Sequence, residues 1–184
     1  MEEAEVGEIL LKERAHDRRL AIFSAILAGE SGLGTEGMTV VGGSAIEIYT
    51  EGDYVSEDLD LVLDSRSRVT TVLRRWGFLD EGKGWSKGGW RLFVDPMETQ
   101  NSGSRRLTQI ISTTYGSFRI SGVEDLIIRR IRESVAWQDR HEAFSQAVLL
   151  FKHARPNLDW AYLEFFAKRE GWERQLSLLS KKTD

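Results

Sequence analysis

The spacing of the apolar residues changes near residue 122, and no other feature of the sequence constrains the fold more strongly. Before this point, runs with apolar residues at alternate positions, which are typical of strands, are mixed with runs of helical spacing. After it only helical spacing occurs, as where Ile127 and Ile131 lie four residues apart. The sequence therefore predicts a region of strands and helices over residues 1–121 and an all-helical region over residues 122–184.

Periodicity also predicts the individual elements. Helices of the first region are predicted over residues 3–29, 44–51 and 67–78. Strands are predicted over residues 38–41, 59–64, 84–97 (a strand or a hairpin), 107–113 and 116–120. Helices of the second region are predicted over residues 122–137, 141–153, 157–170 and 171–180. A glycine-rich segment at 101–104 predicts a loop.

Composition limits the compartment and the partners. The chain has no cysteine, which excludes disulfides, thiolate metal sites and a Cys nucleophile, and favours a cytoplasmic protein. No apolar run is long enough to cross a membrane, so no membrane partner is expected. A net charge of −4 gives no general attraction to nucleic acid, so an RNA partner would need a local basic patch. The six tryptophans favour roles in the core and in subunit contacts of a homo-oligomer.

Two aspartates lie in a segment that otherwise has the pattern of a core strand. Asp58 and Asp60 are two residues apart, so they share one face of that strand. Burying carboxylates without compensation is costly, and like charges on one face raise each other's pKa. Three explanations stay open: an arginine pairs with the aspartates, they lie on an exposed face of the sheet, or they bind a hard cation such as Mg²⁺.

Two further carboxylates extend this pattern. Asp95 ends the apolar run 91–94 and could add a third carboxylate from a neighbouring strand. Asp64 continues the alternation and is a spare candidate, although the end of a strand is more typical of a turn or cap residue. A carboxylate cluster that holds two metal ions roughly 3.5–4 Å apart would suit in-line displacement at phosphorus.

The turn Gly42-Gly43-Ser44 follows one predicted strand and opens a helix. Its glycines permit a tight path, and the first N–H groups of the helix form a site for an anion. Ser44 and Glu47 also match the S-x-x-E capping box, in which the serine only caps the helix. From the turn alone, a helix cap and a phosphate cradle remain equally open.

These motifs, in this order, resemble the signature of the DNA polymerase beta-type nucleotidyltransferase superfamily. "GGS" at 42–44 opens a helix, "DLD" at 58–60 lies in an apolar strand, and "VD" at 94–95 ends a later one. The chain is most similar to small bacterial and archaeal nucleotidyltransferase-like proteins, including antitoxin-type ones, whose later E-D-L-I helix it matches with "VEDLIIRRI" at 123–131. The resemblance covers residues 38–131, but the chain lacks the acidic pair that such relatives often carry on the following helix.

The resemblance implies an α+β fold, with a nucleotidyltransferase-type mixed sheet flanked by helices and an all-helical C-terminal portion. It implies a nucleoside triphosphate as substrate and Mg²⁺, or alternatively Mn²⁺, as cofactor. The implied nucleotide-binding residues are Gly42, Gly43, Ser44 and Arg130, and the implied metal ligands and catalytic residues are Asp58, Asp60 and Asp95. Asp95 would also activate the acceptor hydroxyl. For Arg130, the alternative is an ordinary solvated or ion-paired helix arginine.

Three functions of different kinds follow as hypotheses. The first is magnesium-dependent transfer of a nucleoside monophosphate from a triphosphate to a hydroxyl of RNA, a protein or a small molecule. The second keeps the fold without catalysis, as a nucleotide-binding or partner-binding module such as the antitoxin that binds a toxin-like protein. The third is a structural domain in which arginines pair with the aspartates.

Other motifs carry less weight. "GLGTEG" at 32–37 matches G-x-G-x-x-G, but a helix precedes it and a strand follows, so a loop is predicted instead of a dinucleotide site. The three histidines lack metal-binding spacing. Basic clusters are predicted as solvated faces, or as a path for a polynucleotide acceptor if two of them flank the carboxylates. These clusters lie at 74–75, 105–106, 129–132 and 181–182.

Overall fold

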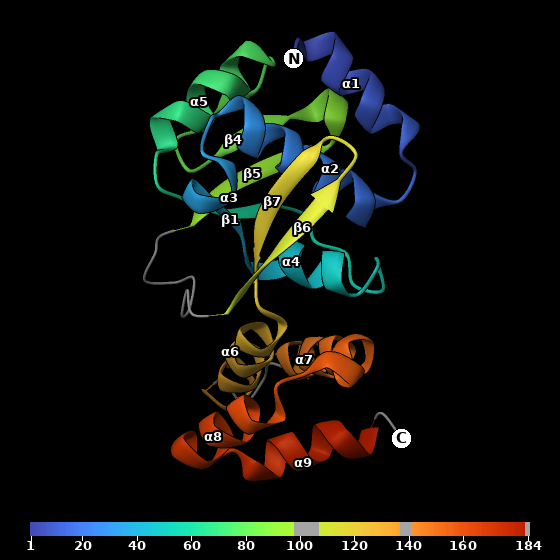
Figure 1. The fold of residues 1–184 in the computed structure, drawn as a ribbon, viewed down its shortest axis with the longest axis vertical. Helices are drawn as coiled ribbons and strands as arrows, with labels where there is room; N and C mark the ends of the chain where they lie inside the picture. The colour runs from blue at the N-terminus through green and yellow to red at the C-terminus, as the bar shows by residue number, and fades with distance from the viewer. Residues whose placement is uncertain (98–106, 137–140, 183–184) are drawn as a thin grey trace. The chain divides into compact units, whose positions relative to one another are not determined.

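The computed structural model describes residues 1–97, 107–136 and 141–182. The glycine-rich segment 101–104 and the basic pair 105–106 lie outside the described residues. The chain divides into two compact units, residues 1–121 and residues 122–184 (Figure 1).

Seven strands of the described residues form one sheet in the order β3-β4-β5-β2-β1-β7-β6 (Figure 1). Their bounds are β1 Met38–Val40, β2 Leu59–Leu63, β3 Leu79–Asp80, β4 Trp85–Lys87, β5 Leu92–Met97, β6 Thr108–Thr113 and β7 Gly116–Ser121. β1 is parallel to β7 and β2 is parallel to β5, while the other neighbours are antiparallel. The sheet is therefore mixed, and with its flanking helices and helical C-terminal part it confirms the predicted α+β class.

Helices flank this sheet within the first unit. They are α1 Glu3–Lys12, α2 His16–Glu30, α3 Gly34–Gly37, α4 Gly42–Tyr49 and α5 Arg66–Arg75, with a short 3-10 turn, η1 Gly88–Trp90. α2 packs against β6, β7 and α4, and α5 packs against α2 and β3. Alternation in β2 buries Leu59 and Leu61 completely, and Asp60 between them is half-buried. The apolar pattern of the sequence therefore predicted this strand and also showed that Asp60 occupies an unusual position for a charged residue.

An aromatic cluster fills the space between α2, the end of α5 and η1. Phe23 and Trp90 lie 6.3 Å apart between ring centroids, and each of them lies 5.6 to 6.4 Å from both Trp76 and Phe78. Trp76 is fully buried, and so is Trp85 on β4. These two tryptophans confirm the predicted role in the core, since large aromatic side chains contribute most of the buried apolar area.

The second unit contains only helices among its described residues. They are α6 Val123–Ala136, α7 His141–Ala154, α8 Trp160–Glu170 and α9 Glu173–Lys182, with the 3-10 turn η3 Arg155–Asn157. α6 packs on α7 and α8 packs on α9. Ile127, Ile131, Phe151 and Leu179 are buried in its core. Helical periodicity thus predicted these helices and the burial of Ile127 and Ile131 on α6.

The structure corrects the single helix predicted over residues 3–29. The chain leaves helical geometry between α1 and α2, where Glu13 and Ala15 have extended backbone angles. The side chain of Glu13 accepts a hydrogen bond from the N–H of Ala15 at 3.0 Å, which satisfies that donor outside a helix. Such local side-chain bonds compete with the helical ladder, and the apolar spacing gives no sign of them.

One loop prediction is refined, and one alternative between a strand and a hairpin is decided. Within 32–37, residues Gly34–Gly37 form one helical turn, α3, in place of an open loop; α2 precedes it and β1 follows, so the order required for a dinucleotide site is absent there. The segment 84–97 is a hairpin, in which β4 and β5 are joined by η1 and Arg91 has the left-handed φ of +51°.

Candidate functional site

The carboxylate of Asp60 lies at the N-terminus of α4. Its Oδ2 accepts hydrogen bonds from the backbone N–H groups of Gly43 and Ser44, at 2.7 and 3.4 Å. The N–H of Asp60 in turn donates to Oγ of Ser44 at 3.1 Å. The first N–H groups of a helix carry partial positive charge and bind anions. In this structure, the anion at the predicted anion site is the side chain of Asp60.

The close approach of Asp60 requires glycine at position 42. Gly42 has φ +60°, and a Cβ on it would lie 2.3 Å from Oδ2 of Asp60. A Cβ on Gly43 would lie 2.8 Å from Oγ of Ser56. Both glycines of the "GGS" motif therefore serve contacts inside the chain, and Gly42 also supplies a backbone conformation that side chains rarely adopt.

The capping box predicted for Ser44 and Glu47 is wrong. α4 begins at Gly42, so Ser44 lies inside its first turn, where its Oγ donates to the carbonyl of Val41 at 3.0 Å. Ser44 thus links α4 to the backbone of Val41 and of Asp60. The pattern S-x-x-E misled because the left-handed Gly42 starts the helix before the serine.

Glu47 has a different role, which sequence reasoning missed. Its side chain is completely buried, with Oε1 2.6 Å from Nδ1 of His16 and Oε2 accepting the N–H of Ser56 at 2.7 Å. Ser56 also donates from Oγ to the carbonyl of Asp58 at 2.9 Å. Glu47 therefore ties α2 and the segment before β2 to α4. A glutamate between two isoleucines in an apolar helix was the available signal.

Asp95 is the cross-strand neighbour of Asp60. The two residues are directly paired in the register of the parallel strands β2 and β5, so their side chains leave the sheet on the same face. Asp58 lies two residues before Asp60, just outside β2. The structure thus pairs Asp60 with Asp95 across two adjacent strands and places Asp58 just before the start of β2.

The pKa values of Asp58 and Asp60 are both raised. Burial raises the pKa of Asp58, and the charges of Asp95 and Glu57 raise it further. Burial also raises the pKa of Asp60; the N–H groups of Ser44 and Gly43 oppose this, and the charges of Asp95 and Asp58 add to it, so that the pKa remains above its ordinary value. The carboxylates therefore repel one another and are incompletely compensated.

Compensation by basic side chains is absent from the described part of the chain. Within it, no Arg or Lys forms an ion pair with Asp58, Asp60 or Asp95. Carboxylate oxygens are the ligands that Mg²⁺ and Mn²⁺ prefer, so the chemistry of this donor set fits such a cation. Across residues 1–97, 107–136 and 141–182, however, no three His, Cys, Asp or Glu side chains are grouped in an arrangement that holds a metal ion.

The chain matches no protein-family model, no curated protein and no solved structure. In the described helices, no stretch combines the length and the apolar character that a membrane span requires.

Arg130, the fourth nucleotide-binding candidate, lies on α6 in the second unit. Its guanidinium donates to Glu133, which also accepts from Arg129 at 3.0 Å. Burial raises the pKa of Glu133, but the charge of Arg130 and the hydrogen bonds from both arginines outweigh burial and leave the pKa lowered. Among the described residues, Arg130 is thus an ion-paired helix arginine, which was the alternative in the sequence analysis.

Asp64, the spare candidate, follows the end of β2 and is exposed. Its N–H donates to the carbonyl of Gly37 at 2.9 Å, which continues the pairing of β1 and β2 by one residue. It lies four residues beyond Asp60 along the strand, outside the carboxylate group. The structure therefore supports its role as a residue at a strand end.

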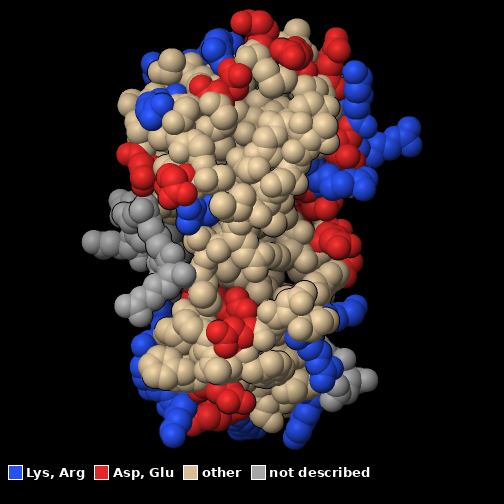
Figure 2. All heavy atoms as spheres, viewed as in Figure 1, with Lys and Arg blue, Asp and Glu red and all other residues tan. Residues whose placement is uncertain are grey.

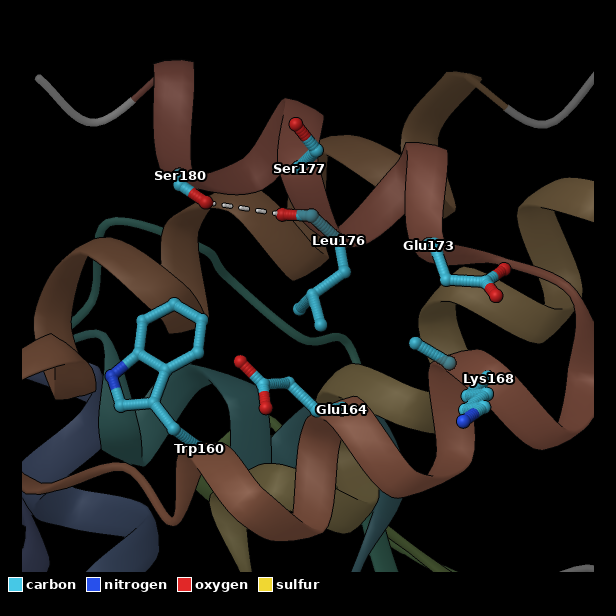
Figure 3. Close-up of a pocket in the computed structure, with 8 residues that line it drawn as sticks. Trp160, Glu164, Lys168, Glu173, Leu176, Ser177 and Ser180 are labelled. Carbon is cyan, nitrogen blue, oxygen red and sulfur yellow. Dashed lines mark hydrogen bonds between the residues drawn. The ribbon is translucent and has the colours of Figure 1, made fainter.

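A separate groove lies in the second unit between α8 and α9 (Figure 3). Its volume is about 420 Å³, and Trp160, Glu164, Lys168 and Leu176 contribute to its lining. No residue of the carboxylate group lines it. On the face shown in Figure 2, the basic and acidic side chains of the described residues are interspersed.

Proposed function

We propose that this protein is a nucleotidyltransferase that uses Mg²⁺, or Mn²⁺, to transfer a nucleoside monophosphate from a triphosphate to a hydroxyl. The acceptor is RNA, a protein or a small molecule. The observation that carries the proposal is the pairing of Asp60 with Asp95 on adjacent strands, next to Asp58, where no described basic residue relieves the repulsion between the carboxylates. A cation would relieve it and would have carboxylate ligands of the preferred kind.

The residues have distinct proposed roles. Asp58, Asp60 and Asp95 would hold the metal, which when bound neutralises charge on the phosphates. In the transfer, the acceptor oxygen attacks the α-phosphorus, the bond to the β-phosphate oxygen breaks and pyrophosphate leaves. The hydroxyl proton passes to a carboxylate, and Asp95 is the proposed acceptor.

Phosphate binding at the turn has a clear requirement. The N–H groups of Gly43 and Ser44 are bonded to Oδ2 of Asp60. A phosphate can take these donors only when Asp60 releases them. Metal binding by Asp60 and phosphate binding by the turn are therefore coupled in this proposal, because both change the partner of the same carboxylate.

The same contact favours a second candidate. A protein whose anion site is filled by its own aspartate could keep the fold without catalysis, as a nucleotide-binding or partner-binding module such as an antitoxin. The structural hypothesis of arginine-paired aspartates has less support, because the described residues contain no such pair.

Labelling experiments separate these functions. The protein is incubated with α-³²P-labelled triphosphates, Mg²⁺ or Mn²⁺, and total RNA or cell protein. We expect transferred label with the wild-type chain and with Asp80→Asn, a matched substitution on the edge strand β3, and none with Asp58→Asn/Asp60→Asn. Binding of nucleotide without transfer favours the module, and transfer by the double variant at the wild-type rate contradicts the proposed site.

A further inference from the structure

β6 is an edge strand of the sheet, and one of its sides has no strand partner among the described residues. It comprises six residues, Thr-Gln-Ile-Ile-Ser-Thr, with neither charge, proline nor glycine. Proteins usually protect an edge of this length with a lysine, a proline or a bulge, because its free N–H and C=O groups can pair with another strand. The opposite edge, β3, is only two residues long and includes Asp80.

The register of the hairpin identifies which backbone groups point outward. β6 and β7 are joined by the two-residue turn Thr114-Tyr115, so Thr113 and Gly116 form the closing hydrogen-bonded pair. Hydrogen-bonded and non-bonded pairs alternate in an antiparallel ladder. Thr108, Ile110 and Ser112 therefore direct their backbone N–H and C=O groups away from β7.

We propose that this edge is a dimer interface, in which β6 pairs antiparallel with β6 of a second copy and Ile110 lies on the two-fold axis. In this register Ile110 faces Ile110 of the second copy, and Thr108 faces Ser112 at both ends. All three facing pairs consist of residues whose backbone groups point outward, so each pair exchanges two hydrogen bonds. The outward backbone N–H and C=O groups of β6 are thus all hydrogen-bonded in this register.

The side chains around this edge permit pairing with an identical strand. No charged residue occurs in 108–113, so like residues meet across the axis without repulsion. Arg119 is the neighbour of Ile110 on β7, and its charge is paired with Glu36 at 2.6 Å. The side chain of Ile110 is 57% exposed in the single chain, and its counterpart would cover it.

Cross-linking tests the register directly. The chain has no cysteine, so Ile110→Cys carries a single thiol. The Cα atoms of a hydrogen-bonded antiparallel pair lie about 5.5 Å apart, which a disulfide can span. We expect mild oxidation to link Ile110→Cys into dimers under native conditions, and to link it far less in guanidinium chloride. Tyr115→Cys, exposed at the turn and about ten strand positions from its counterpart, is the matched control and should stay unlinked.

Light scattering on a sizing column tests the interface without cysteine. We expect the wild type and Ile110→Thr to elute as dimers at high micromolar concentration, because threonine is uncharged and suits a strand. Ile110→Lys, which places like charges on the axis, should be a monomer with unchanged circular dichroism. A monomeric wild type, a dimer that survives Ile110→Lys, or equal cross-linking of both cysteine variants would overturn the proposal, whatever the outcome of the nucleotide assays.

Discussion

At the scale of single residues, Asp60 dominates the candidate site. Its carboxylate is bonded to the start of α4, and yet its pKa is raised, because burial and the neighbouring charges outweigh the two N–H bonds. The sequence could predict that this aspartate needs a partner, since charge is rare at such positions. It could not predict that the partner is a backbone turn, because this depends on a close approach that only the folded chain makes.

The raised pKa values predict how stability varies with pH. In the folded chain, Asp58 and Asp60 keep their protons at a pH at which the unfolded chain has released them. Ionising them therefore costs more in the folded chain, so their charges lower the free energy of unfolding at neutral pH. This loss is relieved as the pH falls through the folded pKa values toward the ordinary aspartate pKa of 3.8. We expect Asp58→Asn/Asp60→Asn to melt above the wild type at pH 7, with a difference that shrinks toward pH 4.

The measurement is a series of metal-free thermal melts at several pH values. Asn at position 60 can still accept the N–H of Gly43 through its amide oxygen, so the substitution removes charge without removing the acceptor. Asp80→Asn, which removes a carboxylate from the edge strand β3, is the control. A double variant that melts below the wild type at pH 7 would show that the charges stabilise the fold.

At the scale of elements, periodicity predicted most strands and helices, while local side-chain bonds decided where they begin and end. Glu13 ends the first helical stretch by binding the N–H of Ala15. The left-handed Gly42 starts α4 two residues earlier than the predicted helix and so removes the capping box. Both features depend on backbone geometry, which apolar spacing does not encode.

The junction of β1 and α4 gives a prediction with a matched control. Gly42→Ala adds a Cβ at φ +60° that would lie 2.3 Å from Oδ2 of Asp60. Gly34→Ala adds one at φ +58° with nothing within 4 Å. We expect Gly34→Ala to lose about 1–2 kcal/mol of unfolding free energy from backbone strain alone, and Gly42→Ala to lose clearly more, in urea denaturation. Equal losses would mean that Asp60 moves away from the turn without cost.

At the scale of the whole molecule, the decisive feature is the pairing of β2 with β5. The sequence could predict that both strands exist and that each bears an aspartate, but many strand orders are compatible with the same apolar pattern. The pairing of Asp60 with Asp95 depends on which strands become neighbours. The α+β class and the all-helical second unit, by contrast, follow from the change in spacing near residue 122.

Binding of a cation should be visible in the stability of the whole chain. A ligand present at a hundred times its Kd adds about 2.7 kcal/mol to the unfolding free energy of the state that binds it. We therefore expect Mg²⁺ or Mn²⁺ to raise the melting temperature of the wild type and of Asp80→Asn. The same ions should leave the melting temperature of Asp58→Asn/Asp60→Asn unchanged, and an equal rise in all three chains would contradict a site at these carboxylates.

The pairing of these strands also bears on how such a chain can vary. Asp60 and Asp95 lie on adjacent parallel strands, so the distance between their backbones is fixed by the ladder at about 4.8 Å. The thirty or so intervening residues, which include α5 and the hairpin of β3 and β4, do not enter into that distance. Insertions or deletions in the loops between Asp60 and Asp95 can therefore accumulate during evolution without changing the distance between the backbones of these two residues.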